Sequence, residues 1–198
     1  MIILSDIHGI LRIPRQLCKQ YPDDFIIQIG DFGFGFVSKS ELKLFGGLPD
    51  NLYFFPGNHD NVEKMKKEKN YLGRYGEKII RDKKFFFVGG AKSVDIDERF
   101  IGNDWWSDEE LNHHESNDCL DQWENSDADL LLSHDCSFDI CSKYFGAFEG
   151  SHTQNLISEM LRIRKPRLHI FGHWHRNFDV TEKDVRYICI DKEQHRII

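Results

Sequence analysis

The chain of 198 residues is 40% hydrophobic and 13% aromatic, which supplies enough apolar material for a packed core and excludes an intrinsically disordered protein. Its 26 basic and 33 acidic residues give a formal net charge of −7, which argues against long nucleic acid as a partner. A small phosphorylated ligand is compatible with this balance, and 10 histidines, the commonest metal-binding residue type, are available.

The first half of the chain alternates short apolar runs with segments of helical spacing. Continuous apolar runs predict buried strands, and the segments between them predict helices. The expected strands are 2–5, 25–29, 52–55 and 85–88, and the expected helices are 14–21, 38–45 and 63–69. Ser38 and Glu41 have the spacing of a capping box at the start of the second helix.

The second half of the chain is richer in strands. We expect helices over 108–123 and 153–164, the latter ended by Pro166, and strands over 130–132 and 168–171. The tail 178–198 alternates apolar and polar residues, as edge or sandwich strands do. Buried strands between helices indicate an α/β layer architecture, and a two-sheet sandwich flanked by helices accommodates both halves. Neither a repeat nor a linker interrupts the sequence, so we expect one domain over 1–198.

Five cysteines occur at irregular spacings, and none lies in a C-x-x-C motif. This pattern argues against a disulfide framework or a cysteine-only zinc site and favours reduced thiols. No stretch reaches the ~20 apolar residues of a membrane span. The short apolar run within 1–6 lacks the basic flank of a signal peptide. We therefore expect a cytoplasmic protein that does not insert in a membrane.

Five of the predicted strands end in clusters of polar residues. Because ligands collect at the carboxyl ends of strands in layered α/β folds, we expect these clusters to form one site. The candidate ligands are Asp6, His8, Asp31, Asn58, His134, His173 and His175. Carboxylate, imidazole and amide donors without a thiolate suit Mn, Fe, Zn or Ni in a catalytic site. The set is too large for one tetrahedral ion and suits two ions ~3.5–4 Å apart that share a bridging carboxylate.

The order of these motifs resembles that of the calcineurin-like metallophosphoesterase family, whose pattern runs D-x-H, GD, GNH[DE], a lone His after a strand, and G-H-x-H. The corresponding segments here are Asp6-Ile7-His8, Gly30-Asp31, Gly57-Asn58-His59-Asp60, Ser133-His134 and Gly172-His173-Trp174-His175. Each motif alone carries little weight, but the ordered set is specific and spans residues 6–175. The resemblance implies a four-layer double β-sandwich flanked by helices.

The resemblance also implies a role for each motif residue. The implied ligands of one ion are Asp6, His8 and His175, and those of the other are Asn58, His134 and His173. Asp31 would bridge the two ions. His59 would face the substrate and protonate the leaving oxygen or stabilise charge on the phosphoryl group. Asp60 would orient His59, as a carboxylate orients an imidazole in a catalytic triad.

These roles predict a phosphoesterase that hydrolyses a small phosphomonoester or phosphodiester, for which a nucleotide is one candidate. Two divalent ions, with Mn as the first candidate, would lower the pKa of a bridging water toward neutrality and clamp the phosphoryl oxygens. The resulting hydroxide would attack phosphorus in line with the leaving group. His59 would supply the acid, a contribution typically worth ~10²–10⁴-fold in rate.

The chain departs from the serine/threonine protein phosphatases of this family. Those proteins carry Asp-Arg-Gly shortly after the GD motif and the sequence GNHE, whereas residues 30–36 here read GDFGFGF and the later motif is GNHD. A block from Gly89 to Trp106 resembles small prokaryotic or phage-type members instead. Two alternatives stay open, a protein phosphatase and a non-catalytic binding module that keeps the fold. A non-catalytic binding module would be expected to lack His59 or one of the metal ligands, but this sequence retains all of them.

Three further residues are candidates for contact with substrate. Arg99 could supply the phosphate clamp that the missing Asp-Arg-Gly arginine would provide, but the sequence favours a solvated surface arginine. Trp105 and Trp106 could form a stacking wall for a base, or they could be ordinary core aromatics.

Overall fold

Two β-sheets pack against each other in the computed structural model, which describes residues 1–35, 37–38, 40–41, 47–102 and 105–198. The first sheet has the strand order β10-β1-β2-β3, and the second has the order β4-β5-β6-β7-β9-β8. The strands of the first sheet are β1 (Ile2–Leu4), β2 (Ile26–Ile29), β3 (Leu52–Phe55) and β10 (His195–Ile197). Those of the second are β4 (Tyr75–Ile80), β5 (Lys83–Val88), β6 (Leu130–Ser133), β7 (Leu168–Phe171), β8 (Phe178–Glu182) and β9 (Val185–Cys189).

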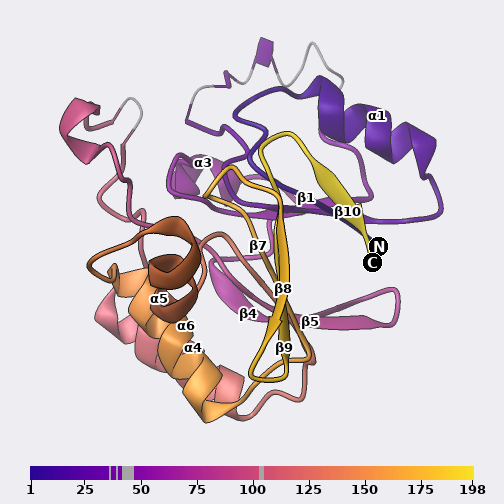
Figure 1. Ribbon diagram of the computed structural model, residues 1–198. Helices are drawn as coiled ribbons and strands as arrows, with labels where there is room; N and C mark the ends of the chain where they lie inside the picture. Colours follow the sequence, from indigo (N-terminus) through magenta and orange to yellow (C-terminus); the bar gives the residue numbers. More distant parts are fainter. Residues whose placement is uncertain (36, 39, 42–46, 103–104) are drawn as a thin grey trace.

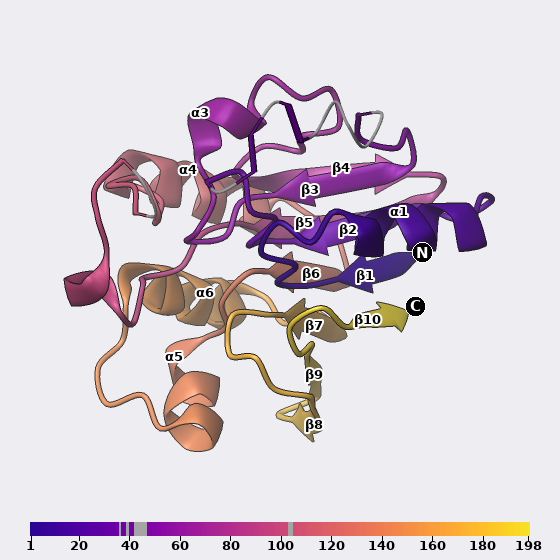
Figure 2. The same ribbon diagram turned by 90° about the horizontal axis from the view of Figure 1, so that it is seen from above.

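The central strands of both sheets are parallel, so their carboxyl ends lie at a common edge. Strands β1, β2 and β3 pair in parallel, and so do β5, β6, β7 and β9 (Figure 2). Within the described ranges, the outer strands β10, β4 and β8 pair antiparallel with their neighbours. The first and last strands, β1 and β10, are adjacent, which brings the two ends of the chain side by side (Figure 1).

Alternate residues of each strand enter different cores, as the two-residue period of a strand requires. Ile2 and Leu4 of β1 face an outer core that also contains Leu17 of helix α1 (Arg12–Gln20), whereas Ile3 enters the core between the sheets. In the same way Phe87 of β5 joins the core between the sheets. Both faces of each sheet are therefore covered by apolar packing.

Helices cover the outer face of the second sheet. The helices α4 (His113–Glu124) and α6 (His152–Ile163) lie side by side on this face (Figure 1). Trp123 of α4 packs against Phe86 with ring centroids 5.1 Å apart, and its indole Nε1 donates to the carbonyl of Met160 at 2.7 Å. The layers thus run helix, sheet, sheet, helices, which confirms the predicted four-layer sandwich.

Short helical segments connect the layers near the strand ends. They are α3 (Val62–Met65), the 3₁₀-helix η1 (Ile96–Glu98), α5 (Phe138–Ile140) and the π-helix η2 (Cys141–Phe145). None of the helices in the described ranges combines the length and apolar character that crossing a membrane requires.

The structure shortens or shifts several predicted helices. The expected helix 108–123 begins at His113, because the side chain of Asn112 caps it there, and the helix expected over 63–69 is Val62–Met65. For the helix expected over 38–45, Ser38 and Glu41 form the reciprocal hydrogen bonds of the capping box, while residues 39 and 42–45 lie outside the described residues. Strand β4 was not predicted, because its exposed residues obscure the apolar pattern.

Candidate metal centre

All seven candidate metal ligands lie just beyond the carboxyl ends of parallel strands. Asp6 and His8 follow β1, Asp31 follows β2, and Asn58 follows β3 in the first sheet. The remaining candidates follow β6 and β7 in the second sheet: His134, His173 and His175. Because the two sheets pack face to face, their strand ends bring these side chains to one edge of the sandwich.

The backbone at this edge is held in an unusual conformation. A positive φ is uncommon for residues other than glycine and costs about 1–3 kcal/mol unless the surroundings enforce it. Five of the candidate ligands nevertheless have positive φ: Asp6 (48°), His8 (43°), Asp31 (55°), His173 (65°) and His175 (48°). Such clustering at a single site is expected where side-chain direction serves a function rather than stability alone.

Two glycines permit the strand-end loops to approach one another. A β-carbon at Gly57 would overlap the side chain of Asp31, and one at Gly172 would overlap Asp6 and Ser5. The glycines of the GNHD and GHWH motifs are therefore needed for space around the two carboxylates.

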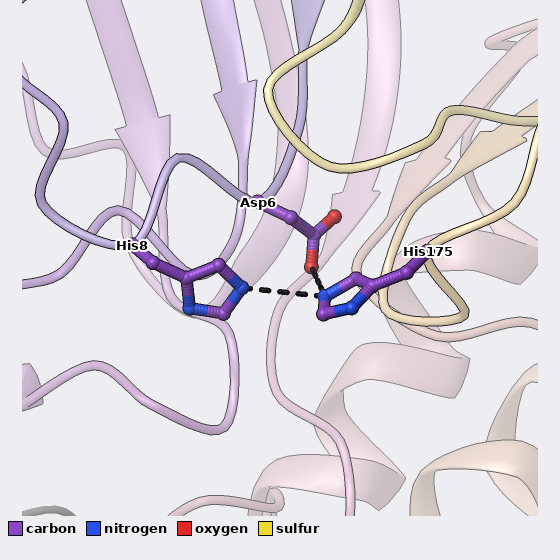
Figure 3. A group of neighbouring side chains, drawn as sticks. All are labelled: Asp6, His8 and His175. Atoms are coloured by element: carbon purple, nitrogen blue, oxygen red, sulfur yellow. Dashed lines mark hydrogen bonds and ion pairs between the residues drawn. The ribbon is translucent and has the colours of Figure 1, made fainter.

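A first group of ligand atoms is formed by Asp6, His8 and His175 (Figure 3). The Nε2 atoms of His8 and His175 are 3.2 Å apart, and His175 Nε2 lies 3.4 Å from Asp6 Oδ1. This Oδ1 is buried and has no hydrogen-bond donor, whereas Oδ2 accepts from the backbone N–H of His173 at 3.1 Å. A buried carboxylate oxygen without a donor is costly, and a cation among these three atoms would satisfy it.

A second group surrounds His134. Its ring Nδ1 donates to the carbonyl of Ile29 at 2.9 Å, which in a neutral imidazole leaves the lone pair on Nε2. That nitrogen faces Asn58 Oδ1 at 3.1 Å and Asp31 Oδ1 at 3.4 Å. The ring of His173 lies beside that of His134, with centroids 5.2 Å apart. With His134 neutral, the three electron-rich atoms would face one another, and a cation bound among them would take the place of a proton on Nε2.

Asp31 stands between the two groups. Its Oδ1 faces His134 and accepts from the backbone N–H of His59 at 2.9 Å, while its Oδ2 lies 3.9 Å from His8 Nε2. Burial disfavours the charged forms of Asp31 and His134, yet their mutual attraction raises the pKa of His134 to about 10 and holds the pKa of Asp31 well below its usual value. The field of this buried carboxylate therefore favours positive charge, which a divalent cation would also supply.

His59 and Arg99 lie together beside Asp31. Arg99 Nη2 is 2.6 Å from His59 Nε2, and Asp95 binds the guanidinium through Arg99 Nε at 2.6 Å and Nη2 at 2.8 Å. The Arg99 side chain is only 8% exposed, which does not fit a solvated surface arginine, and its contact with phosphate stays a prediction. Burial, aided by Arg99, outweighs the attraction of Asp31 and lowers the pKa of His59 to about 4. The His59 ring is therefore neutral near pH 7 in the unliganded protein.

Asp60 fastens the loop that carries Asp31 to the loop that carries His59. Its Oδ2 accepts from the backbone N–H groups of Phe32 and Gly57, both at 3.0 Å. Its Oδ1 accepts from Gly33 at 2.7 Å and Phe34 at 3.0 Å. These bonds position His59 through the backbone. The direct carboxylate–imidazole contact that the resemblance implied stays a prediction.

An open cavity of about 450 Å³ gives access to this centre. Its lining contains His8, Asp31, Asn58, His59, Val94, Asp95, Arg99, His173, Trp174 and His175. Of the described residues, Trp105 and Trp106 are not in this lining, and Trp106 packs against Gly35. Their contact with a substrate base stays a prediction, whereas Trp174 already borders the cavity.

Two residues that no sequence pattern indicated hold Asn58 in place. Asn58 Nδ2 donates to Ser93 Oγ at 3.0 Å, and Ser93 Oγ donates to Glu109 at 2.5 Å. This chain fixes the amide so that its oxygen points at His134. Ser93 follows the Gly89-Gly90-Ala91 turn by two positions, but only the three-dimensional structure reveals its contact with a residue 35 positions earlier.

The structure thus combines a double β-sandwich with a cavity at its edge that is lined by candidate metal ligands. The family model for calcineurin-like phosphoesterases matches residues 1–177. The chain therefore belongs to the calcineurin-like phosphoesterase family, which confirms the predicted resemblance. None of the curated proteins matches its sequence.

Solved structures share the fold at low sequence identity. A dimetal phosphatase from Danio rerio has a TM-score of 0.58 at 12% identity, with 97% of this chain and 87% of that chain covered. Phosphopantetheinyl hydrolase from Mycobacterium tuberculosis has a TM-score of 0.52 at 13% identity, covering 97% and 89%. An archaeal phosphodiesterase has a TM-score of 0.48 at 18% identity, covering 97% and 84%. The likenesses to the first two structures concern the fold alone.

Proposed function

We propose that this protein is a dinuclear-metal phosphoesterase that hydrolyses a small phosphomonoester or phosphodiester, with a nucleotide among the candidate substrates. The observation that carries the proposal is the position of Asp31, whose two oxygens face His134 on one side and His8 on the other. A carboxylate between two groups of imidazole, amide and carboxylate donors is the arrangement that a pair of cations requires.

The proposed ligands divide into two sets around Asp31. Asp6, His8 and His175 hold one ion, and Asn58, His134 and His173 hold the other. Two divalent cations, when bound, supply Lewis acidity toward phosphoryl oxygens and lower the pKa of a water molecule toward neutrality. The oxygen and nitrogen donors, without a thiolate, support Mn first and Fe, Zn or Ni as alternatives.

His59 contributes a hydrogen bond to the phosphoryl group or the leaving oxygen. Its ring lies in the cavity lining, 3.8 Å from Asp31 Oδ2, and its side chain is 17% exposed. Because burial keeps the free ring neutral, we favour stabilisation of developing charge by an N–H donor, with protonation of the leaving oxygen as the complementary role. Asp60 supports this position through the backbone.

Arg99 takes the part of the phosphate clamp that the GD loop lacks. The Asp95 carboxylate fixes its guanidinium on the cavity wall, next to His59. A guanidinium in a partly desolvated site binds phosphoryl oxygens by charge-assisted hydrogen bonds. Arg99 thus takes the place of the Asp-Arg-Gly arginine that follows the GD motif in protein phosphatases and is missing here. A phosphate-binding guanidinium at this position supports the proposal that the substrates are small phosphorylated compounds.

The net charge of the chain and the state of its cysteines support two further parts of the proposal, a compact substrate and a location in a reducing compartment. The formal charge of −7 disfavours long nucleic acid. All five cysteines are buried and free, which is consistent with the cytoplasmic location that we propose.

The direct test is turnover by the Mn²⁺-loaded protein of p-nitrophenyl phosphate and bis-p-nitrophenyl phosphate, with bound metal counted in the same sample. We expect two Mn²⁺ per chain and hydrolysis of at least one of the two esters. Two bound ions without turnover of either ester would contradict the proposal and favour a binding module.

A further inference from the structure

A second cavity adjoins the metal cavity. Its volume is about 420 Å³, within the range of roughly 300–1,000 Å³ that small-molecule sites occupy. It is lined by Lys92, Ser93, Val94, Ile96, Phe145, Gly146, Ala147, Phe148, Glu149, Ser151, Gln154 and Trp174. Val94 and Trp174 line both cavities, so a ligand can extend from the metal centre into this space.

The walls of the second cavity combine exposed apolar side chains with several polar ones. Phe148 is fully exposed, Val94 is 81% exposed, and Ile96 is 37% exposed. Lys92 and Glu149 supply one charge of each sign. Because their charges cancel, this compartment does not favour a second phosphate group. Apolar side chains around a concave space beside a polar centre mark a place for an uncharged organic group.

Trp174 forms a fixed wall that the two cavities share. Its ring stacks on Phe145 with centroids 4.8 Å apart and an interplanar angle of 17°. Its Nε1 donates to Asp135 Oδ1 at 2.9 Å, and Gln154 donates to the other oxygen of the same carboxylate at 3.0 Å. A ring fixed at its polar edge and along one face offers a preformed apolar surface, which lowers the entropic cost of binding.

We propose that the second cavity binds the organic group of the substrate ester and selects an aromatic or other bulky apolar group over a small one. This inference rests on the proposed function and deepens it. The phosphoryl group lies beside Arg99 and His59, and the organic group lies between Trp174, Phe148 and Ile96. The substrate class is therefore phosphate esters of apolar, preferably aromatic alcohols.

Binding of two phosphonates tests this inference without turnover. Phenylphosphonate and methylphosphonate present the same anionic group to the metal centre and differ in the organic group. We expect titration calorimetry of the Mn²⁺-loaded protein to give a Kd for phenylphosphonate at least about tenfold below that for methylphosphonate. Equal Kd values would overturn the inference.

Variants show whether the second cavity causes the difference. We expect Phe148→Ala to reduce the ratio of the two Kd values to about threefold or less, and Ile96→Ala to reduce it as well. Phe100→Ala is the matched control, because Phe100 is also largely exposed at 72% and lies outside the described lining of the cavity. A ratio that falls equally in Phe100→Ala, or that stays unchanged in Phe148→Ala, would contradict the proposed position of the organic group.

A paired kinetic comparison separates this inference from the proposed function. Phenyl phosphate and methyl phosphate differ only in the organic group, and the release of inorganic phosphate is measured for both. We expect the lower KM for the phenyl ester. Turnover of both esters with equal KM would overturn the substrate selection and leave the phosphoesterase intact. Loss of turnover for both, with the phosphonate preference retained, would overturn the phosphoesterase and leave the apolar cavity intact.

Discussion

Replacing Ser93 with alanine tests how the metal centre is held together. Ser93 is 2% exposed and connects Asn58 to Glu109 through its hydroxyl. In Ser93→Ala the amide of Asn58 loses its acceptor and Glu109 loses a donor, while the backbone N–H of Ser93 still donates to Glu109 at 3.1 Å. Asn58 is then free to turn its oxygen away from His134.

The expected size of the effect follows from these two lost bonds. Leaving a buried polar group unpaired costs about 1–3 kcal/mol, so the two losses in Ser93→Ala should lower the free energy of unfolding by roughly 2–6 kcal/mol. Loss of a residue that orients a metal ligand typically costs about 10–100-fold in metal affinity. We expect this loss at the ion bound by Asn58, with the ion bound by Asp6 and His8 retained.

Titration with Mn²⁺, with free ions counted by electron paramagnetic resonance, measures both affinities. Ser126→Ala is the matched control, because Ser126 is also buried and donates to a glutamate, Glu77, at 2.6 Å, but lies on a different part of the fold. We expect the control to lose stability with unchanged metal affinity. Wild-type Mn²⁺ binding by Ser93→Ala, or an equal loss in Ser126→Ala, would refute the proposed positioning of Asn58.

Three further outcomes are expected. His59→Asn should retain two Mn²⁺ per chain and lose about 10²–10⁴-fold in kcat on an ester with a poor leaving group, and full activity would exclude the proposed role. Arg99→Met should raise KM for p-nitrophenyl phosphate about tenfold or more, because a charge-assisted contact with the phosphoryl group is lost; an unchanged KM would remove Arg99 from the substrate site. Removal of metal by a chelator should abolish hydrolysis, and added Mn²⁺ should restore it. Activity that survives complete removal, verified by elemental analysis, would contradict a metal-dependent mechanism.

The sequence was most informative where a strand ended. Apolar runs of four or five residues located β1, β2, β3 and β7 within one residue at each end, because burial on both faces leaves little room for polar residues. The polar residues after those strands were predicted to meet, and the parallel pairing brings them together. Topology and periodicity therefore carried most of the information about the site.

Contacts between distant segments could not be predicted. Nothing in the sequence connects Ser93 with Asn58, and the spacing gave no indication that Asp95 fixes Arg99 at the cavity wall. Trp174 was identified only as the variable position of a motif, yet it borders two cavities. Edge strand β4 was missed because several of its side chains are exposed, so its sequence lacks the continuous apolar run of a buried strand. Such features depend on packing between elements, which local patterns do not encode.

The most direct test of the central claim is the magnetic coupling of bound Mn²⁺. A carboxylate shared by two ions a few ångströms apart would produce an exchange-coupled signal in electron paramagnetic resonance. We predict such a signal at two Mn²⁺ per chain and its loss in Asp31→Asn. One bound ion per chain, or two ions with an uncoupled signal, would contradict a dinuclear centre bridged by Asp31.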